Sequence, residues 1–459
     1  MAATCASASP RCSTSSAGSG DQSTEAPPAT VEVDLSAWLA HIATVHPRAM
    51  ELGLERVRTV AEKMGLARPA PFVFTIAGTN GKGSTLAAIE AILLGSGLRT
   101  GSYMSPHLER YNERIRLGGI ECEDEAICAA LAKVEQAREG ISLSYFEFST
   151  LAALNVFAGE RLDALLLEVG LGGRLDAVNI IDADVALITN IELDHQEWLG
   201  GNRELIGAEK AGILRPGAPL IYCDVDPPAS VTKRAGELGA PVYRHGSDFG
   251  ASIDTRKWSW WGRNADGEVQ IGGLEKPGLP LASMSAALQA VHLSPLPLSE
   301  KGIRGVQLKA GLPGRLESCR DRAGGLPVLL DVSHNPAAAR LLSDRIAEFR
   351  TGREPRGKVA AVLAALADKD IEGMAAALSA QVDVWYIAEV EDSRGMAAAE
   401  LRLRLTRSLP GAAISAADSV ASAYRQAVDS GSDLVVVTGS FHTVAAVRPL
   451  TTAGGSPGH

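Results

Sequence analysis

Several features that mark other protein classes are scarce or missing in this chain of 459 residues. No apolar run approaches the roughly 20 residues that span a bilayer, so we expect no membrane contact. The six cysteines form no CxxC pair and have no histidines at zinc-finger spacing, which predicts reduced thiols in a cytoplasmic protein. Basic residues are outnumbered, and the net charge of −10 argues against a nucleic-acid scaffold. The partners expected are therefore small molecules.

The N-terminal residues 1–30 are rich in Ala, Ser and Thr and lack the apolar core of a secretory signal. We expect them to form a disordered extension. The rest of the chain is too long for one ordinary hydrophobic core, and its hydrophobic content of 46% is that of a soluble globular protein. Two domains in a monomer are expected.

A glycine-rich segment, Gly78-Thr79-Asn80-Gly81-Lys82-Gly83-Ser84-Thr85, follows an apolar run that ends at Ala77 and precedes a helical pattern. A strand, glycine loop and helix in this order point backbone N–H groups and a helix N-terminus at one spot, which suits a polyphosphate. Lys82 would neutralise the β- and γ-phosphates, and the hydroxyl of Ser84 or Thr85 can reach a shared Mg²⁺ ion. We call residues 78–85 the phosphate loop. It is a variant, because Gly83 separates the lysine from the hydroxyl residue.

Strand and helix patterns alternate along the rest of the chain, which predicts an α/β protein. The first series predicts a P-loop mononucleotide-binding domain with a mostly parallel sheet, interrupted by a small antiparallel segment at about 243–280. A Gly/Pro hinge near residue 312 leads to a second series, which predicts a smaller Rossmann-like α/β domain. The expected division is 1–30 extension, 31–311 ATP-binding domain, 312–450 C-terminal domain and 451–459 flexible tail. The strands expected in the two series are 72–77, 164–169, 185–189 and 219–222, then 328–332, 359–363, 384–387 and 434–438.

Two polar residues, Glu168 and His195, follow predicted strands of the first domain. Ligands of such sheets bind at the carboxyl ends of the strands, so both residues converge on the phosphate loop if their strands flank it. A carboxylate and a neutral imidazole suit a second divalent ion. The alternatives are a histidine that caps a helix and a glutamate in a salt bridge.

Nine motifs follow one another in the order GTNGKGST, SPHLERYNERIRL, FEFSTLAAL, EVGLGGRLDAVN, ITNIELDH, EKAGIL, LPGRLE, LDVSHNP and GSFHTV. Together they resemble the dihydrofolate synthase/folylpolyglutamate synthase family, which belongs to the Mur-ligase-like amide ligases. The resemblance runs from about residue 33 to 450, and the motifs LDVSHNP and GSFHTV are most similar to those of the bifunctional enzymes of proteobacteria.

The resemblance implies a role for each matching residue. The ATP site would comprise Thr79, Asn80, Gly81, Lys82, Gly83, Ser84, Thr85, Arg315 and Asp331. Two Mg²⁺ ions would be held by Ser84, Ser105, Glu168 and His195, and a monovalent cation is a further candidate cofactor. Glutamate would be bound by Arg114, His334 and Ser440, and the pterin by Gly53, Phe146, Glu147, Asp176 and Asn179. The catalytic residues would be Lys82, Lys210, Arg315 and His334, with His334 as the candidate general base.

Lys210 matches a lysine that is carbamylated in the family. Burial near cations lowers the pKa of a lysine enough for its amine to react with CO₂. The residues alone favour a different interpretation, an ordinary ion pair with Glu209 on a helix surface.

Two positions depart from the family pattern. Ser283 stands where an asparagine beside the adenine is usual, and a hydroxyl lacks the paired donor and acceptor of an amide. Ser333 stands where alanine is usual, and we expect its hydroxyl to matter little. The first departure puts adenine selectivity in doubt, although not phosphate binding.

The implied reaction joins L-glutamate to dihydropteroate, or to the γ-carboxylate of reduced folates, through an acyl phosphate made with ATP. The alternatives are a monofunctional folylpolyglutamate synthase and a Mur-type ligase acting on another carboxylate, such as a UDP-sugar peptide. A non-enzymatic nucleotide-dependent binding protein is a further alternative because of Ser283.

Overall fold

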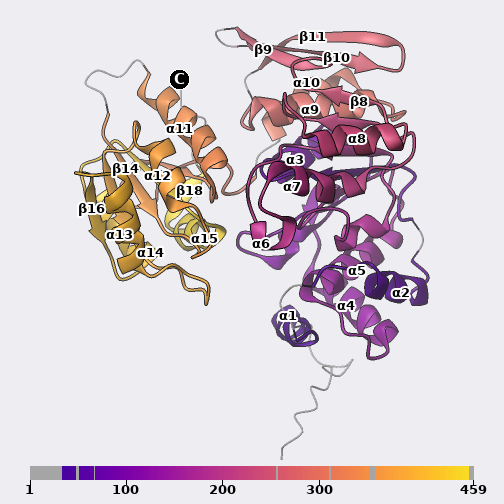
Figure 1. Cartoon of the computed structure of the whole chain (residues 1–459), viewed down its shortest axis with the longest axis horizontal. Coiled ribbons are helices and arrows are strands. Elements are labelled where there is room, and N and C mark those ends of the chain that lie inside the picture. Colours follow the sequence, from indigo (N-terminus) through magenta and orange to yellow (C-terminus); the bar gives the residue numbers. More distant parts are fainter. Residues whose placement is uncertain are drawn as a thin grey trace, which may run out of the picture.

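The computed structural model describes residues 34–47, 51–66, 68–254, 257–275, 277–309, 312–351 and 357–453. Within these ranges the chain forms two α/β units that face each other across the middle of the molecule (Figure 1). The expected N-terminal extension and residues 310–311 at the expected domain boundary lie outside the described residues.

The first unit is built on an eight-stranded sheet in the order β4-β3-β2-β5-β1-β6-β7-β8. Strands β2, β5, β1, β6, β7 and β8 run parallel, whereas β3 and β4 add antiparallel strands at one edge. The bounds are β1 Val73–Ala77, β2 Thr100–Tyr103, β3 Ile115–Leu117, β4 Ile120–Glu121, β5 Ala164–Glu168, β6 Val185–Ile188, β7 Leu220–Tyr222 and β8 Val242–Arg244. The predicted parallel sheet is confirmed, with β1 at its centre.

Alternation along β1 divides the hydrophobic core of this unit in two. Val73 and Ala77 face one layer of helices, and Phe74 and Ile76 face the other. The first layer contains α1 Leu35–Thr44, α2 Glu55–Lys63, α4 Asp124–Arg138, α5 Tyr145–Ala158, α7 Arg203–Lys210 and α8 Ala229–Glu237. The second contains α3 Lys82–Gly95, α9 Leu281–His292 and α10 Glu300–Lys309. Both faces of the sheet are covered, which explains why its strands read as continuous apolar runs.

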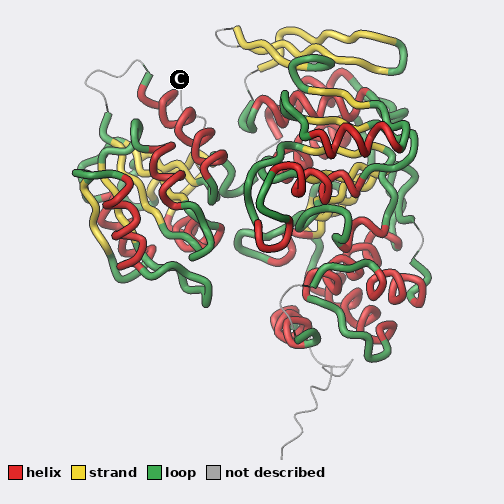
Figure 2. The backbone as a smooth tube through the Cα atoms, in the orientation of Figure 1, coloured by secondary structure: helices red, strands yellow, loops and turns green. Residues whose placement is uncertain are grey.

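A separate three-stranded antiparallel sheet, β11-β10-β9, lies at one end of the first unit (Figure 2). Its strands are β9 Gly250–Asp254, β10 Lys257–Asn264 and β11 Gly267–Glu275. Trp258 and Trp260 of β10 are buried against α9, whereas Trp261, which follows Trp260, is partly exposed. The predicted antiparallel segment is therefore confirmed, and a pair of buried tryptophans anchors it.

The second unit has a seven-stranded sheet in the order β16-β15-β14-β17-β13-β12-β18. Five strands are parallel, and β12 and β18 close one edge antiparallel. The strands are β12 Glu317–Asp321, β13 Pro327–Leu330, β14 Val359–Leu363, β15 Val384–Ile387, β16 Ala413–Ala416, β17 Leu434–Thr438 and β18 Thr451–Ala453. The helices are α11 Pro336–Arg350, α12 Ile371–Leu378, α13 Ala398–Ser408, α14 Val420–Val428 and α15 Phe441–Val447.

One expectation about this unit is wrong. Residues 451–453 belong to β18 rather than to a flexible tail, because they pair with β12 between Cys319 and Asp321. The remaining residues of the expected tail, 454–459, lie outside the described part of the chain.

Candidate active site

The phosphate loop between β1 and α3 needs glycine at two positions because of its backbone conformation and close contacts. Gly78 has φ +147°, and a Cβ atom there would lie 1.7 Å from Oγ1 of Thr189. Gly81 has φ +82° and is the N-cap of α3. Because the first N–H groups of a helix have no partner within it, the N-terminus of α3 offers donors and a positive dipole end to an anion. The predicted anion-binding geometry is therefore present.

Lys82 occupies the first turn of α3. Its Nζ donates to the carbonyl oxygens of Gly78 and Thr79 at 3.1 and 3.2 Å, so the ammonium lies over the loop. Loss of hydration lowers its pKa below the ordinary value, although the charge of Glu168 opposes this shift. The loop therefore holds a poorly hydrated cation whose close contacts are to neutral carbonyls. A phosphate would pair with this cation more strongly than the carbonyls do.

Glu168 ends β5, and β5 lies directly beside β1. The side chain is 3% exposed, and its Oε2 accepts from the backbone N–H of Ser105 at 3.1 Å. Burial raises the pKa of this carboxyl, whereas Lys82 and Arg315 act to lower it. A buried carboxylate next to a phosphate loop is a suitable oxygen ligand for a divalent cation.

The larger cavity of the site, about 540 Å³, lies between the two units. The phosphate loop contributes Asn80, Gly81 and Thr85 to its wall, and the second unit contributes residues of α11. Ser283 of α9 lines it as well. The hydroxyl of Thr85 is buried without a hydrogen-bond partner among the described residues. This cavity has room for a nucleoside beside the loop.

A smaller cavity, about 70 Å³, lies on the other side of the phosphate loop. Gly83, Ser105 and Glu168 line it from the first unit, and Arg315 and Phe441 line it from the second. The guanidinium of Arg315 lies 5.1 Å from the centroid of the Phe441 ring, a cation–π contact that holds it toward the cavity wall. Both cavities thus border the phosphate loop, and each has walls from both units.

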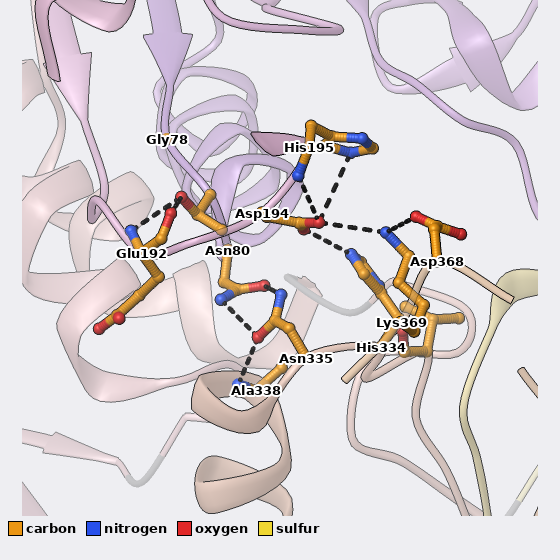
Figure 3. Close-up of polar contacts among 12 residues, drawn as sticks. Gly78, Asn80, Glu192, Asp194, His195, His334, Asn335, Ala338, Asp368 and Lys369 are labelled. Atoms are coloured by element: carbon orange, nitrogen blue, oxygen red, sulfur yellow. Dashed lines mark hydrogen bonds and ion pairs between the residues drawn. The ribbon is translucent and has the colours of Figure 1, made fainter. Parts of the chain in front are cut away.

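Asp194, the residue before His195, joins the two units (Figure 3). Its Oδ1 accepts from Nζ of Lys369 at 3.1 Å, and its Oδ2 lies 3.4 Å from Nε2 of His334. Burial opposes ionisation, but His334, His195 and Lys369 together hold the pKa of Asp194 well below its usual range. The carboxylate is therefore an ionic bridge between the units. Asn80 and Asn335 form a second bridge, because each amide donates to the other at 3.1 and 2.9 Å.

Glu168 ends β5 and His195 lies in the loop after β6, and these two strands flank β1 on opposite sides, which is the condition set for both residues to approach the phosphate loop. His195 has a φ of +48° at the N-cap of α6, Gln196–Leu199, and its side chain is 40% exposed. Within the described ranges, no three His, Cys, Asp or Glu side chains gather around one point that could hold a metal ion. The predicted metal ligands include only one carboxylate and one imidazole, so phosphate oxygens and water would have to complete any Mg²⁺ site.

Lys210 is buried rather than paired on a helix surface. It is 4% exposed, and its Nζ donates to the carbonyl of Gly78 at 3.0 Å. Burial, with help from the charge of Lys82, lowers its pKa to about 7. Glu209 pairs with Arg174 at 2.8 Å instead. The ion-pair interpretation is therefore wrong, and Lys210 presents an amine that is partly neutral near pH 7 to the phosphate loop.

The family described as Mur ligase, glutamate ligase domain, matches residues 314–441. A dihydrofolate synthase/folylpolyglutamate synthase of Escherichia coli (strain K12) is 43% identical over 426 residues, which cover 92% of this chain and 97% of that protein. The chain belongs to the dihydrofolate synthase/folylpolyglutamate synthase family. Its members are ATP-dependent ligases, and the two-unit α/β architecture described above is that of this family.

Two solved structures of the family match nearly the whole chain. The E. coli enzyme in complex with DHPP and ADP has a TM-score of 0.84 and 43% identity, covering 91% of this chain and 97% of its own. A bifunctional folylpolyglutamate synthase/dihydrofolate synthase with Mn, AMPPNP and L-glutamate bound has a TM-score of 0.82 and 46% identity, with coverage of 90% and 97%.

Of the glutamate candidates of this synthase, Arg114 and His334 come from different units. Arg114 is 8% exposed in the 3₁₀ turn Tyr111–Arg114. His334 has both ring nitrogens near oxygens, with Nδ1 3.0 Å from the carbonyl of Val332 and Nε2 facing Asp194. Ser440 is the N-cap of α15, where its Oγ accepts from the N–H of Thr443. A neutral His334 ring that donates from Nδ1 to Val332 keeps a lone pair on Nε2, which faces the carboxylate of Asp194.

The pterin candidates lie around α5 and the turn after β5. The ring of Phe146 covers Gly170, where a Cβ atom would come within 2.7 Å of it. Glu147 is engaged by the backbone of Ser144 and by Arg56 at 3.0 Å, so it fixes the start of α5. Two further candidates bind the chain itself. Asp176 accepts from Leu171 and Val178, and Asn179 donates to the carbonyls of Arg174 and Gly212.

Burial raises the pKa of Asp176 to about 6, although the backbone N–H groups of Leu171, Val178 and Gly170 act to lower it. The backbone of Gly53 is half-buried just before α2.

Asp331 is expected in the ATP site, but its carboxylate is bound by neighbouring groups of the chain. Its Oδ2 accepts from the N–H of Leu316 at 2.8 Å, and its Oδ1 accepts from the N–H of Ser333 and, at short range, from the Ser333 hydroxyl. The residue is 8% exposed and is not part of the larger cavity's wall, although the neighbouring Leu316 is. The Ser333 hydroxyl thus matters more than expected, because it binds the carboxylate of Asp331, which the resemblance assigns to the ATP site.

Two residues at the junction of the units, Asp194 and Lys369, are not among the site residues predicted from the sequence. Lys369 is 7% exposed in the segment between β14 and α12. The same rule that found Glu168, a polar residue after a buried strand, applies to the sequence Asp368-Lys369-Asp370 and could have found it.

Proposed function

We propose that this enzyme joins L-glutamate to dihydropteroate and to the γ-carboxylate of reduced folates, with ATP as the energy source. The observation that carries the proposal is the pair of cavities on the two sides of the phosphate loop, one sized for a nucleoside and one lined by Glu168 and Arg315. The relatives bound to ADP and DHPP, and to Mn, AMPPNP and L-glutamate, support the same set of substrates.

In the first step, a carboxylate oxygen of the folate substrate attacks the γ-phosphorus of ATP, and the bond to the β-phosphate oxygen breaks to release ADP. Lys82 and Arg315 approach the transferring group from the two units and stabilise its negative charge. A divalent metal held by Ser84, Ser105, Glu168 and His195 with the phosphates would supply further charge neutralisation. The product of this step is an acyl phosphate.

In the second step, the glutamate α-amine attacks the acyl carbon, inorganic phosphate leaves as the amide forms, and the proton that the amine loses would pass to a base, for which His334 is the candidate. Arg114, His334 and Ser440 are the residues we assign to glutamate, with Arg114 as the fork for a carboxylate. Gly53, Phe146, Glu147, Asp176 and Asn179 are assigned to the pterin side, and Thr79, Asn80, Gly81, Gly83, Thr85 and Asp331 to ATP. Both walls of each cavity must be in place, so catalysis depends on closure of the first unit against the second.

Lys210 has a separate role in this proposal. Its amine is buried and its pKa is about 7, so a neutral fraction is available to combine with CO₂. The carbamate would replace a cation by an anion beside the phosphate loop, where it could orient the ligands of a second metal ion.

Parallel product assays test the proposal. Purified enzyme, ATP and L-glutamate are incubated with dihydropteroate in one set and with a reduced folate in another, and products are identified by mass spectrometry. The K82A variant, prepared identically, controls for contaminating ligase. Products in both sets support the bifunctional enzyme, and extension of the reduced folate alone supports a monofunctional synthase. Absence of both products would overturn the proposal.

A further inference from the structure

The guanidinium of Arg114 lies in an aromatic cage. Its Cζ is 5.5 Å from the ring centroid of Tyr111 and 5.7 Å from that of Tyr145. Burial of a charge is costly unless the charge is paired or otherwise stabilised. The two rings offset part of that cost through cation–π attraction, and they limit the planes in which the guanidinium can lie.

Three other buried or partly buried arginines of the chain have a carboxylate partner. Arg116 lies 3.3 Å from Glu90, and Arg350 and Arg56 contact Asp383 and Glu147. In the described part of the chain, no carboxylate lies within ion-pair distance of Arg114.

The partner of Arg114 is an imidazole. Its Nε donates to Nδ1 of His107 at 2.8 Å. An arginine carries only donors, so Nδ1 must present a lone pair and the ring proton sits on Nε2. His107 therefore fixes the direction of Nε without neutralising the guanidinium. The two Nη groups keep the full positive charge and the fork geometry that a carboxylate recognises.

The loop that holds His107 is itself rigid. The carboxylate of Glu113 accepts from the N–H groups of Leu108, Glu109 and Arg110, each at 2.7 Å. The His107 ring also meets the edge of Tyr111, with centroids 5.9 Å apart. A contact between two preorganised groups holds a functional side chain more accurately than one made by a mobile residue.

We propose that His107 is a positioning residue for the amino-acid substrate, which orients Arg114 toward the incoming carboxylate while leaving its charge available. The inference rests on the proposed function, in which Arg114 binds glutamate. A carboxylate at position 107 would accept the same hydrogen bond but would compete with the substrate for the guanidinium. The neutral acceptor is therefore the feature that matters.

Three substitutions separate orientation from charge. H107N keeps a neutral acceptor near the position of Nδ1, H107L removes it, and H107D makes it anionic. We expect H107L to raise KM for glutamate about tenfold, with kcat and KM for ATP changed less than about threefold. H107N should keep most of the affinity for glutamate, and H107D should weaken it at least as much as H107L. H41N is the matched control, because His41 bonds Glu135 on helices away from the cavities.

Several outcomes would overturn the inference. These are an unchanged KM for glutamate in H107L, equal defects in H107N and H107L, or a KM in H107D as low as in H107N. If H107L does not fold, as judged by thermal unfolding, the isosteric pair H107N and H107D decides alone. R114A separates the two proposals. An unaltered KM for glutamate in R114A means that the assignment of Arg114 has failed, whereas a raised KM in R114A with an unaltered H107L means that only the role of His107 has failed.

Discussion

The two sheets present polar residues at their strand ends in different ways. At the sheet of the first unit, Lys82 and Lys210 contact backbone carbonyls, and Glu168 is buried with one backbone donor. At the sheet of the second unit, both carboxylate oxygens of Asp331 accept hydrogen bonds from the chain, and His334 faces two acceptors. The first unit thus keeps charges that the chain does not fully satisfy, and the second unit supplies mostly groups that already have hydrogen-bond partners.

This difference indicates a division of labour. Under-satisfied charges cost stability unless a ligand completes them, so they mark where phosphate and metal are expected to bind. Engaged groups, Asp194 of the first unit and Lys369 of the second, instead fix how the two units meet. Arg315 is the exception on the C-terminal side, because its guanidinium contacts an aromatic ring and lines a cavity shared with Glu168. The comparison can be tested by changing each group in turn.

The largest effect is expected for K82A. The phosphate loop would lose the ammonium that lies over it, and with it at least about 3 kcal/mol of transition-state stabilisation, or more than about 100-fold in kcat. ADP release and product formation measure the loss. The matched control is K63A, since Lys63 pairs with Glu139 on the surface at 2.7 Å. Near-normal turnover in K82A would mean that the ammonium of Lys82 does not stabilise the transition state, and the contrast drawn between the two units would fail.

A smaller effect is expected for R315A. Because Arg315 reaches the site from the second unit, its loss should lower kcat by about 10- to 100-fold while the Kd for ATP changes less than about threefold. Equilibrium binding of a non-hydrolysable ATP analogue and steady-state kinetics measure the two quantities. Equal loss in both would show that Arg315 is a ground-state ligand of the nucleotide. R315K tests whether charge without the stack on Phe441 is enough.

Local sequence patterns predicted the parts of this site whose residues lie close together in the sequence. The phosphate loop, the strands on both sides of it and the antiparallel excursion each have a signature of glycines, apolar runs or turn residues. The bridge of Asp194 to His334 and Lys369 has none, because it joins residues that are far apart in the chain and meet only when two units dock. A sequence shows which residues follow strands, but not which of them face another domain.

Burial was hard to infer for the same reason. Glu209 and Lys210 are neighbours on α7, yet one pairs with Arg174 and the other is buried against Gly78. Successive residues on a helix point about 100° apart, and only the packing of α7 decides which of them faces the loop. The hydroxyl of Ser333 was underestimated likewise, because its contact with Asp331 depends on the backbone turn between them.

A third prediction concerns the stability cost of Lys210. Its pKa is about 7 in the folded state and 10.5 is the reference value, so the unfolded chain binds more protons between these limits. The penalty is fully present below about pH 7 and fades as pH rises toward 10.5. K210M should therefore gain stability relative to the wild type at pH 6.5, and the difference should shrink steadily up to pH 10. Urea unfolding in CO₂-free buffer without Mg²⁺ measures it.

A difference between K210M and the wild type that does not vary with pH would contradict this account of Lys210. Added bicarbonate and Mg²⁺ then test the carbamate separately. The carbamate is an anion, so in their presence the pH dependence of the wild type should change and that of K210M should not. K210M should also be impaired in catalysis while remaining folded.

The smallest effect is expected for S283N, because this substitution in the wall of the larger cavity changes no charge. Ser283 is 6% exposed, lines the larger cavity and lies next to Gly81, where a Cβ atom would be 3.5 Å from its Oγ. A serine hydroxyl can satisfy one edge atom of a purine, whereas an asparagine amide offers a paired donor and acceptor. One additional hydrogen bond is worth about 1 kcal/mol, so kcat/KM for ATP relative to GTP should rise about fivefold in S283N. The ratio is its own control, because a folding defect lowers both values equally. An unchanged ratio would mean that Ser283 does not contact the base, and that nucleotide affinity in this enzyme comes from the under-satisfied charges of the phosphate loop.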